Sequence, residues 1–389
     1  METPETPKRT SSPVALLLAA LVLTTYTWAF LHAESQLAVA VLLAVAGVLV
    51  VLSRRLGTTR TLEASAAARP GLARALAALG ALALIAAFHN SHFVLLMLCA
   101  VLLYSTACLG LTLQFGYSGV ANFAGAAFFG IGSYATAVLA THTAIPHLLV
   151  VLISGAVAAA IGSMLILPVL RTRGHYAALV TIAFGILFKT FIEVNDVLGG
   201  PQGLQVPGMK LFGFAFNDGI RLPGVEISFY VAYAVLSLLV FAGVFALVSA
   251  LERSWVGLSM DVVRTDETAA ATFGLHIVRW KVVAFTMGNF FAGIAGSLYG
   301  MVSGFVAPNN FTFGDSLLMV SIVILGGLGN IVGLLPAAVI VLVLPEKLQF
   351  IQEYRFLLFS ALVIVILLFR PQGLLPRKTR IFFRSKAPE

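Results

Sequence analysis

The chain has 389 residues, of which 60% are hydrophobic and 10% are charged. Globular proteins carry about a quarter charged residues, so this composition excludes a water-soluble protein and predicts an all-α polytopic membrane protein. The net charge of +8 would suggest nucleic acid as a partner of a soluble protein, but here the basic residues flank apolar runs, where they set membrane orientation. Cys99 and Cys108 lie in one apolar run, so neither a disulfide framework nor a cysteine-based metal site is expected.

Apolar runs long enough to cross about 30 Å of hydrocarbon recur along the whole chain and predict about ten to twelve spans, a broken pair included. They are 14–31, 37–52, 72–88, 93–113, 120–141, 147–169, 177–192, 228–250, 281–303, the broken pair around 316–343, and 356–369. A cleaved signal peptide is the alternative for the first run; it lacks a clean cleavage site and a second span follows at once, so we expect it to be retained. We divide the chain into an N-terminal extension with about three spans (1–90), a core (91–376) and a basic tail (377–389).

Lysine and arginine residues set the orientation of these spans. They fall on one side, which we expect to be cytoplasmic and to hold both termini: Lys8, Arg9, Arg54, Arg55, Arg60, Arg69, Arg74, Arg171, Arg173, Arg253, Arg264, Arg279, Lys281, Arg370, Arg377, Lys378, Arg380, Arg384 and Lys386. A single span at 316–343 would place the tail outside, so Gly326–Asn330 is predicted to separate two crossings. The loop from Glu193 to Ile227 then lies outside, where its turn cluster Gly199–Gly203 forms either a compact ledge or a flexible connector.

Glycine is unusually dense between Gly116 and Tyr134, together with Ser, Asn and Tyr. Such a sequence weakens a helix, and irregular backbone at membrane depth survives only when it is buried in protein or lines a cavity. Core packing and pathway lining are therefore the two interpretations. If the stretch lines a pathway, the candidate residues are Tyr117, Ser118, Asn122 and Gly125, with Tyr176 and Thr181 nearby.

One polar island, Ser254–Gly274, separates two apolar runs. Its sequence predicts a short helix, with Thr265 as the N-cap, Asp266 and Glu267 in the first turn and Gly274 as the stop. A solvated loop is the alternative. In the span that follows, small residues recur every four positions, which permits close approach of another helix and a joint that transmits motion. These residues are Gly288, Ala292, Gly296, Gly300 and Gly304.

Motifs for chemistry are missing from the sequence, so we expect neither an enzyme nor a bound cofactor or metal. There is no phosphate-binding loop ending in Gly-Lys-Ser/Thr, and the histidines lack ligand spacing on one helix face. Ionisable residues are nearly absent from the spans, whereas a stand-alone ion-driven carrier normally keeps some as relays. A driving force that enters from outside the chain is therefore favoured over a secondary carrier or channel.

Several segments resemble one family in unbroken order from Leu95 to Pro376. They are Gly116–Gly119 with Ala126–Tyr134, Leu170–Tyr176 with Val180–Gly185, Gly199–Leu204, the island, Ala292–Gly300, Gly326–Asn330 and Phe369–Leu375. This set is similar to the permease subunits of bacterial branched-chain amino-acid ABC importers, of the LivM type. The family often has His or Gln at the position of Gly125, and Asp at that of His175.

The resemblance implies an inner-membrane subunit that pairs with a homologous second permease, two cytoplasmic ATP-binding subunits and a periplasmic substrate-binding protein. It makes the island a coupling helix: Arg264, Asp266 and Glu267 would make polar contacts with the ATPase, while Ala269, Ala270 and Phe273 would lie in its groove and Gly274 would end the helix. The polar residues of the glycine-rich stretch would face a cavity shared with the second permease. Leucine, isoleucine and valine are the expected substrates, and urea or another small amide or amino acid is the alternative.

Overall fold

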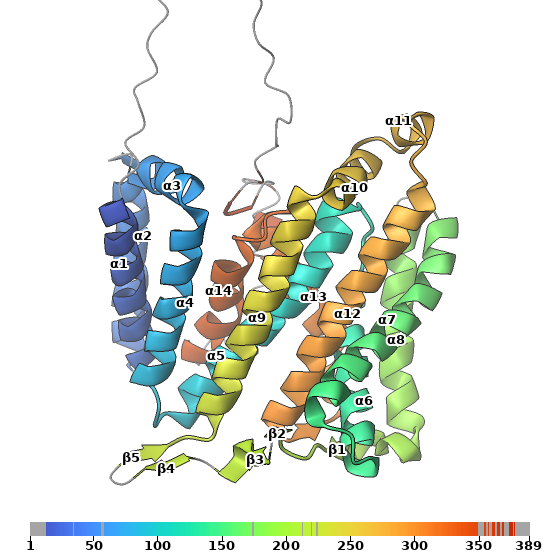
Figure 1. The fold of residues 1–389 in the computed structure, drawn as a ribbon, viewed down its shortest axis with the longest axis horizontal. Coiled ribbons are helices and arrows are strands. Elements are labelled where there is room, and N and C mark those ends of the chain that lie inside the picture. Colours follow the sequence, from blue (N-terminus) through green and yellow to red (C-terminus); the bar gives the residue numbers. More distant parts are fainter. Residues whose placement is uncertain are drawn as a thin grey trace, which may run out of the picture.

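The computed structural model describes residues 13–33, 35–55, 58–172, 175–211, 213–218, 220–222 and 225–348. Beyond these it describes only positions 354, 357, 360–361, 364–365, 368, 373–375 and 377. Within this part of the chain, eight helices are long and apolar enough to cross a membrane. The helices stand side by side, with short strands at one end and the polar island at the other (Figure 1). The predicted all-α membrane architecture is confirmed.

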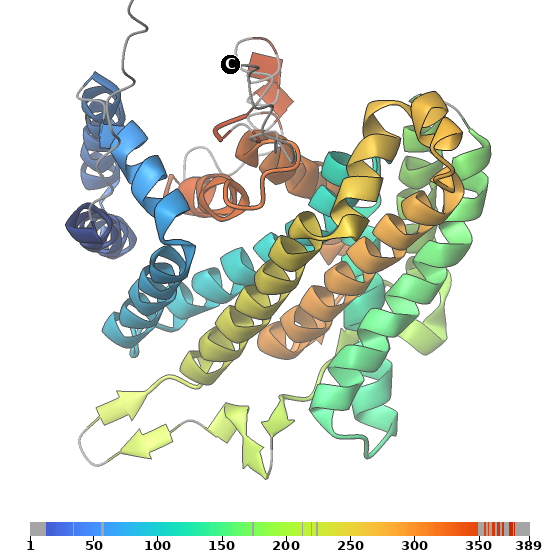
Figure 2. The ribbon, with the colours of Figure 1, turned by 45° about the horizontal axis from the view of Figure 1, so that its top comes forward.

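The N-terminal helices form a group at one side of the molecule (Figure 2). They are α1 (Pro13–His32), α2 (Gln36–Arg55), α3 (Thr58–Ala68) and α4 (Pro70–Ala87). Polar contacts at both ends of the described helices join this group to the rest of the chain. Arg74 Nη2 on α4 donates to Ser249 Oγ at 2.8 Å. At the other end, Lys347 Nζ donates to the carbonyls of Leu31 and Ala33 at 2.6 and 3.0 Å.

A central helix, α12 (Ile277–Ser303), organises the remaining helices by packing against α5, α6 and α7. The neighbouring elements are α5 (His92–Thr112), its π-helical extension η1 (Leu113–Tyr117), α6 (Gly125–His142), α7 (His147–Arg171), α8 (His175–Val194) and α9 (Tyr230–Arg253). Hydroxyl groups connect three of these helices inside the core. Thr136 Oγ1 lies 2.5 Å from Ser297 Oγ and 2.8 Å from Ser154 Oγ. Such pairs satisfy polar groups that have no water to bind at this depth.

The predicted continuous span 120–141 is wrong at its beginning. Residues 118–124 have no helical structure, and α6 starts only at Gly125. The side chain of Asn122 explains the interruption, because its Oδ1 accepts a hydrogen bond from the backbone N–H of Ala124 at 2.9 Å. Asparagine competes with helical hydrogen bonding in this way. The chain therefore turns back through an irregular segment between α5 and α6.

The end opposite the island is a layer of short antiparallel pairs and 3-10 turns (Figure 1). Its elements are η2 (Asp196–Leu198), η3 (Gly200–Gln202), β1 (Leu204–Gln205), β2 (Lys210–Leu211), β3 (Phe214–Ala215), η4 (Phe216–Asp218), β4 (Ile220–Leu222), β5 (Val225–Ile227), β6 (Phe305–Val306) and η5 (Pro308–Asn310). Strand β1 pairs with β6, β2 with β3, and β4 with β5. A Cβ on Gly199, whose φ is +81°, would lie 2.1 Å from Gly203 O. Of the two interpretations of Gly199–Gly203, the compact ledge is therefore confirmed.

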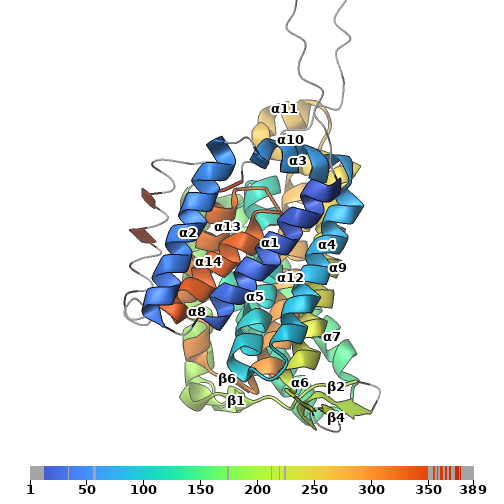
Figure 3. The same ribbon diagram turned by 90° about the vertical axis from the view of Figure 1, so that its left-hand side faces the viewer.

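The predicted break after Gly326 is also confirmed. Helix α13 (Phe313–Gly326) begins with a capping box in which Thr312 accepts a hydrogen bond from Asp315 N, and a separate helix, α14 (Leu334–Lys347), follows the turn. Beyond the turn, Leu374 N donates to Leu325 O at 2.7 Å. The end of the described chain therefore lies beside this turn, at the same end as the island (Figure 3). The last predicted span, 356–369, falls mostly outside the described residues.

Candidate functional site

The polar island folds as two helices instead of one, α10 (Trp255–Thr265) and α11 (Glu267–Thr272). The predicted N-cap, Thr265, is wrong by one residue. Asp266 has the extended backbone of a cap, and its Oδ1 accepts hydrogen bonds from Thr268 N and Ala269 N at 2.8 and 3.0 Å. Thr265 instead ends α10, where its hydroxyl donates to Asp261 O at 2.8 Å. The second helix therefore begins with a carboxylate at its positive end.

Gly274 ends α11 as the sequence predicts. Its φ is +77°, and its N–H donates to Ala271 O at 3.0 Å while Leu275 N donates to Ala270 O at 3.1 Å. These two bonds are those of a Schellman motif, which favours glycine because of the left-handed backbone. A 2.6 Å contact between Lys281 Nζ and Glu267 Oε1 then joins α11 to the start of α12.

The surface of α11 differs from the expected groove-binding set. Phe273 is 82% exposed, a high value for a phenylalanine at a helix end. Ala270 is fully buried within this chain, so it supports the helix from behind and offers no surface to a partner. Its methyl group is small enough for α11 to pack closely on the residues beneath it. The exposed surface of the island consequently has an apolar tip beside the carboxylates of Asp266 and Glu267.

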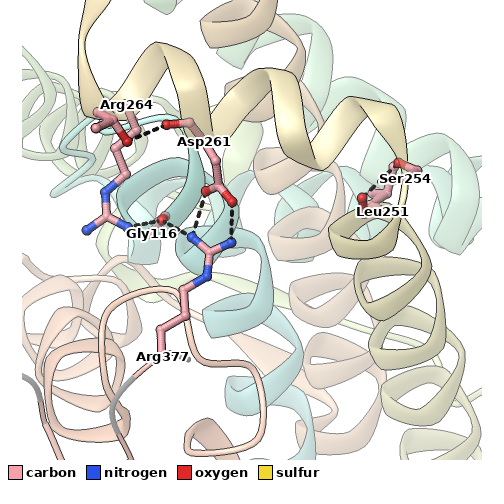
Figure 4. A network of polar contacts seen from close by, with 7 residues as sticks. Gly116, Leu251, Ser254, Asp261, Arg264 and Arg377 are labelled. Carbon is pink, nitrogen blue, oxygen red and sulfur yellow. Dashed lines mark hydrogen bonds and ion pairs between the residues drawn. The ribbon is translucent and has the colours of Figure 1, made fainter. Parts of the chain in front are cut away.

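A charged network fixes α10 to the end of α5 (Figure 4). Both guanidinium nitrogens Nη1 and Nη2 of Arg377 donate to the Asp261 carboxylate at 2.6 Å. The same guanidinium lies 4.1 Å from the centre of the Tyr117 ring. Gly116 O accepts hydrogen bonds from Arg264 Nη1 and, at 3.3 Å, from Arg377 Nη1. Two cations therefore share the carbonyl at the end of η1, and the Asp261 carboxylate pairs with one of them, Arg377.

Burial and mutual repulsion act on the two cations differently. Burial lowers the pKa of Arg264, and the positive charge of Arg377 lowers it further. For Arg377, burial also acts to lower the pKa, but the hydrogen bond to Asp261 and the proximity of Tyr117 outweigh it, so the pKa is raised. Asp261 thus stabilises the charged form of Arg377 most strongly. Arg377, which the sequence predicts to lie in a basic tail, contacts the core at Asp261.

Three buried amide side chains form a second cluster, between the irregular segment and α12. Asn122 Nδ2 donates to Gln114 Oε1 at 2.8 Å and to Asn289 Oδ1 at 3.3 Å. Gln114 Nε2 donates to Asn289 Oδ1 and to Phe285 O, each at 3.0 Å. The three amides are at most 1% exposed. Asn122 therefore faces the interior of this chain, not an open surface, and it fixes residues 118–124 against α12.

The other candidate pathway residues fall into two groups. Thr181 on α8 is buried and accepts a hydrogen bond from Phe123 N at 3.0 Å, so it lies beside the irregular segment as expected. Ser118 is buried and donates to Gln114 O at 2.9 Å. Tyr176, by contrast, is 69% exposed at the start of α8.

Gly125 also faces the interior. A Cβ at this position would lie 3.0 Å from Leu111 Cδ1 and 3.2 Å from Met319 Sδ. Enlarging it would overpack the contact between α6, α5 and α13. On the irregular segment and η1, the partly exposed aromatic side chains are Phe115 and Phe123, whose rings meet edge to face at 5.6 Å. Sequence reasoning missed both of them, because an aromatic residue in an apolar run carries no distinctive signal.

The small residues of α12 permit close packing, but on different neighbours. A Cβ on Gly288 would lie 2.6 Å from Gly110 O of α5, and one on Gly296 would lie 1.8 Å from Phe129 O of α6. Ala292 is 2% exposed. At Gly300 the nearest atom would be 3.4 Å away, an ordinary contact. Gly304 follows the helix with a φ of +69° and has nothing within 4 Å. The row is thus tight at Gly288 and Gly296 and loose beyond them.

These features define a polytopic membrane protein with a closely packed central helix, α12, and a pair of short polar helices, α10 and α11, at one end. Residues 93–368 match the family described as branched-chain amino acid transport system / permease component. The chain is 35% identical over 290 residues to the high-affinity branched-chain amino acid transport system permease protein LivM of Salmonella typhimurium, covering 71% of this chain and 68% of the relative. LivM of Escherichia coli matches with the same identity and coverage.

The high-affinity branched-chain amino acid transport system permease protein LivH of Escherichia coli is 25% identical over 293 residues, which cover 70% of this chain and 91% of the relative. No solved structure matches the chain. The chain belongs to the family of permease components of branched-chain amino acid transport systems, which confirms the resemblance drawn from its motifs. The family match begins at the start of α5 and leaves α1–α4 outside it.

Proposed function

We propose that this chain is the membrane-spanning permease subunit of a bacterial ABC importer for leucine, isoleucine and valine, and that it forms the translocation pathway with a homologous second permease. Two relatives support the substrate and the second permease. LivM and LivH are both permease proteins of high-affinity branched-chain amino acid transport systems, and both are similar to this chain. Urea or another small amide remains the alternative substrate class, since the described geometry contains no site that distinguishes these ligands.

The observation that carries this proposal is the pair of short helices, α10 and α11, between α9 and α12. In Figure 1 it projects beyond the ends of the membrane-spanning helices. A polar element with an exposed apolar tip, Phe273, is suited to dock on a partner in water. We propose that α10 and α11 contact the cytoplasmic ATP-binding subunits, of which the importer has two. Arg264, Asp266 and Glu267 would set the charge complementarity of the contact, with Phe273 in place of Ala270 as its apolar anchor.

The proposed orientation puts the island and Arg377 in the cytoplasm and the strand layer on the periplasmic side of the inner membrane. The distribution of lysine and arginine supports it. The ledge around β1 and β6 then presents a folded surface for a periplasmic substrate-binding protein. A cysteine at Gln202, which is exposed, should react with an impermeant reagent from outside, and one at Glu267 only after the membrane is opened. The reverse pattern would overturn the orientation.

The proposed pathway runs along the irregular segment after η1. The buried amides of Gln114, Asn122 and Asn289 support it from behind, while Phe115 and Phe123 offer an apolar surface that suits a branched side chain. Cysteines at these two phenylalanines should react with a small thiol reagent in the assembled complex, and substrate should slow the reaction. No protection at either position would exclude them from the pathway.

Uptake by purified complexes in vesicles tests the proposed function. We expect Phe273→Asp to reduce ATP-driven leucine uptake at least about tenfold, the loss that removing about 1.4 kcal/mol of docking energy produces. Phe273→Leu is the matched control, because it keeps an apolar side chain at the same exposed position. Equal uptake by both variants would contradict the docking role. Uptake by this chain without the ATPase, driven by an ion gradient, would instead establish a secondary carrier.

A further inference from the structure

A cavity of about 370 Å³ lies at the seam between the N-terminal helices and the permease core. Its walls are α1 and α4 on one side and α5 and α14 on the other. The family match covers only the second pair of walls. None of the residues of the proposed pathway lines this cavity.

The walls of the cavity are almost entirely apolar. The wall side chains are aliphatic or alanine, with a glycine and two threonines. Thr24 Oγ1 donates to Ala20 O at 2.6 Å and Thr27 Oγ1 to Leu23 O at 2.8 Å, so their own helix satisfies both hydroxyls. A polar ligand would find no partner here, and water does not fill an apolar cavity of this kind. The chemistry of the walls fits a hydrocarbon chain.

The depth of the cavity matches one leaflet. Along α1 it extends from Leu16 to Thr27, a rise of about 16 Å in a helix. This is roughly half of a 30 Å hydrocarbon core. On both α1 and α4 it begins within a turn or so of the helix start, at Leu16 and Ala73. The cavity walls at Leu16 and Ala73 therefore lie near the end of the molecule that holds α3 and the island, which is the cytoplasmic side in the proposed orientation. Figure 3 shows α3, α10 and α11 at this shared end.

Charge at that end of the cavity is strongly positive. Arg69 is exposed directly before α4, and Arg74 lies on its first turn, beside the cavity residue Ala73. From Ser53 to Arg74 the chain has five arginines and a single acidic residue, Glu63. Basic residues next to membrane helices attract anionic lipid headgroups by about 1 kcal/mol each. The charge therefore complements a phosphate above the cavity.

We propose that this cavity binds one acyl chain of an anionic phospholipid, whose phosphate pairs with Arg69. The bound lipid would fill the seam and fix α1–α4 against the permease core. The choice of leaflet rests on the orientation proposed above. The binding itself does not, because it follows from the cavity and from the charge at its mouth.

Lipid retention by the purified permease complex tests the proposal. The complex is titrated with dioleoyl phosphatidylglycerol or dioleoyl phosphatidylcholine, and bound lipid is counted by native mass spectrometry. Ala77→Phe places a ring in the cavity, and we expect it to weaken phosphatidylglycerol binding about tenfold for every two methylenes it excludes. Leu79→Phe is the control, because Leu79 is 60% exposed on the same helix and outside the cavity.

The headgroup is tested separately. Arg69→Gln should weaken phosphatidylglycerol about fivefold and leave phosphatidylcholine unchanged, while Arg171→Gln, an exposed arginine at the end of α7, should change neither. Ala20→Leu adds a smaller side chain to the cavity from α1. It replaces Ala77→Phe in the test if the complex with Ala77→Phe does not assemble. Equal retention by the Ala77 and Leu79 variants would overturn the proposal, as would a crosslink from a cysteine at Ala77 to the second permease. Retention is measured without ATP or substrate, so its failure leaves the transport proposal untouched.

Discussion

The contact between Asp261 and Arg377 should hold α10 in place, and its removal gives the sharpest test of the network around Gly116. Arg377→Ala removes the two 2.6 Å hydrogen bonds to Asp261 and the cation over the Tyr117 ring. It leaves the carboxylate facing only Arg264, whose guanidinium already donates to Gly116 O. We expect α10 to detach locally while the membrane-spanning helices stay folded.

The magnitude follows from geometry and exposure. Hydrogen bonds to charged groups contribute about 1.5–3 kcal/mol, and a partly exposed cation–π contact adds about 0.5–1 kcal/mol. The two side chains are 20% and 35% exposed, so solvent screens part of the attraction. A net contribution of about 2 kcal/mol results, which raises the open population of α10 roughly 30-fold when it is lost. Arg377→Lys keeps the charge but not the two-nitrogen contact, and we expect about a fivefold rise.

Hydrogen exchange measures this opening directly. Amides in a peptide that covers α10 should exchange about 30-fold faster in Arg377→Ala when opening and closing are fast, while a peptide from α7 serves as the internal control. The double variant with Asp261→Ala should be no worse than Arg377→Ala alone, because both substitutions remove the contact between Asp261 and Arg377. Unchanged exchange in Arg377→Ala, or fully additive effects in the double variant, would refute the reasoning.

Three further predictions concern the helix packing, the amide cluster and the island. Gly296→Ala should destabilise the complex by about 1–3 kcal/mol in detergent unfolding, because the backbone of α6 occupies the space of the added methyl group. Gly300→Ala should change the stability by less than about 0.5 kcal/mol, and equal effects of the two variants would contradict the packing. Gln114→Leu removes the hydrogen bonds of this side chain to Asn122, Asn289 and Phe285 O and should cost about 1–3 kcal/mol, and an unchanged midpoint would contradict it. Glu267→Lys should uncouple ATP hydrolysis from uptake in vesicles while Lys281→Met does not, and identical coupling in the two would exclude a docking role for the carboxylate.

Charge counting in the sequence predicted what hydropathy alone could not. The turn at Gly326–Asn330 follows from the need to return the basic tail to its own side of the membrane, and the structure has two separate helices there. The cap of α11 shows the limit of such reasoning. Thr265 and Asp266 are both good N-caps, and only the backbone angles of the folded chain decide between neighbouring candidates.

The polar residues in the glycine-rich stretch show a different limit. Composition indicated that Asn122 needs protein or a cavity beside it, but its partner Asn289 lies 167 residues away. One sequence contains no information that pairs them. The same holds for Asp261 and Arg377, 116 residues apart. Long-range polar pairs therefore had to come from the structure, whereas local signals such as Gly274 as a helix stop could be read directly.

The relative strengths of these contacts decide how the island acts on the spans in the proposed importer. Helix α11 is joined to α12 by Lys281 and Glu267, and the Glu267 side chain is 56% exposed, so this pair contributes at most about 1 kcal/mol. The contact of α10 with Arg377 and the end of η1 is about twice as strong by the reasoning above. A force on the island therefore breaks the contact between Lys281 and Glu267 before it breaks the α10 contact, while residues 273–276 keep α11 joined to α12. We infer that α10 gives displacement a second route, to Gly116 and the irregular segment behind it, where the amide cluster connects it to the middle of α12.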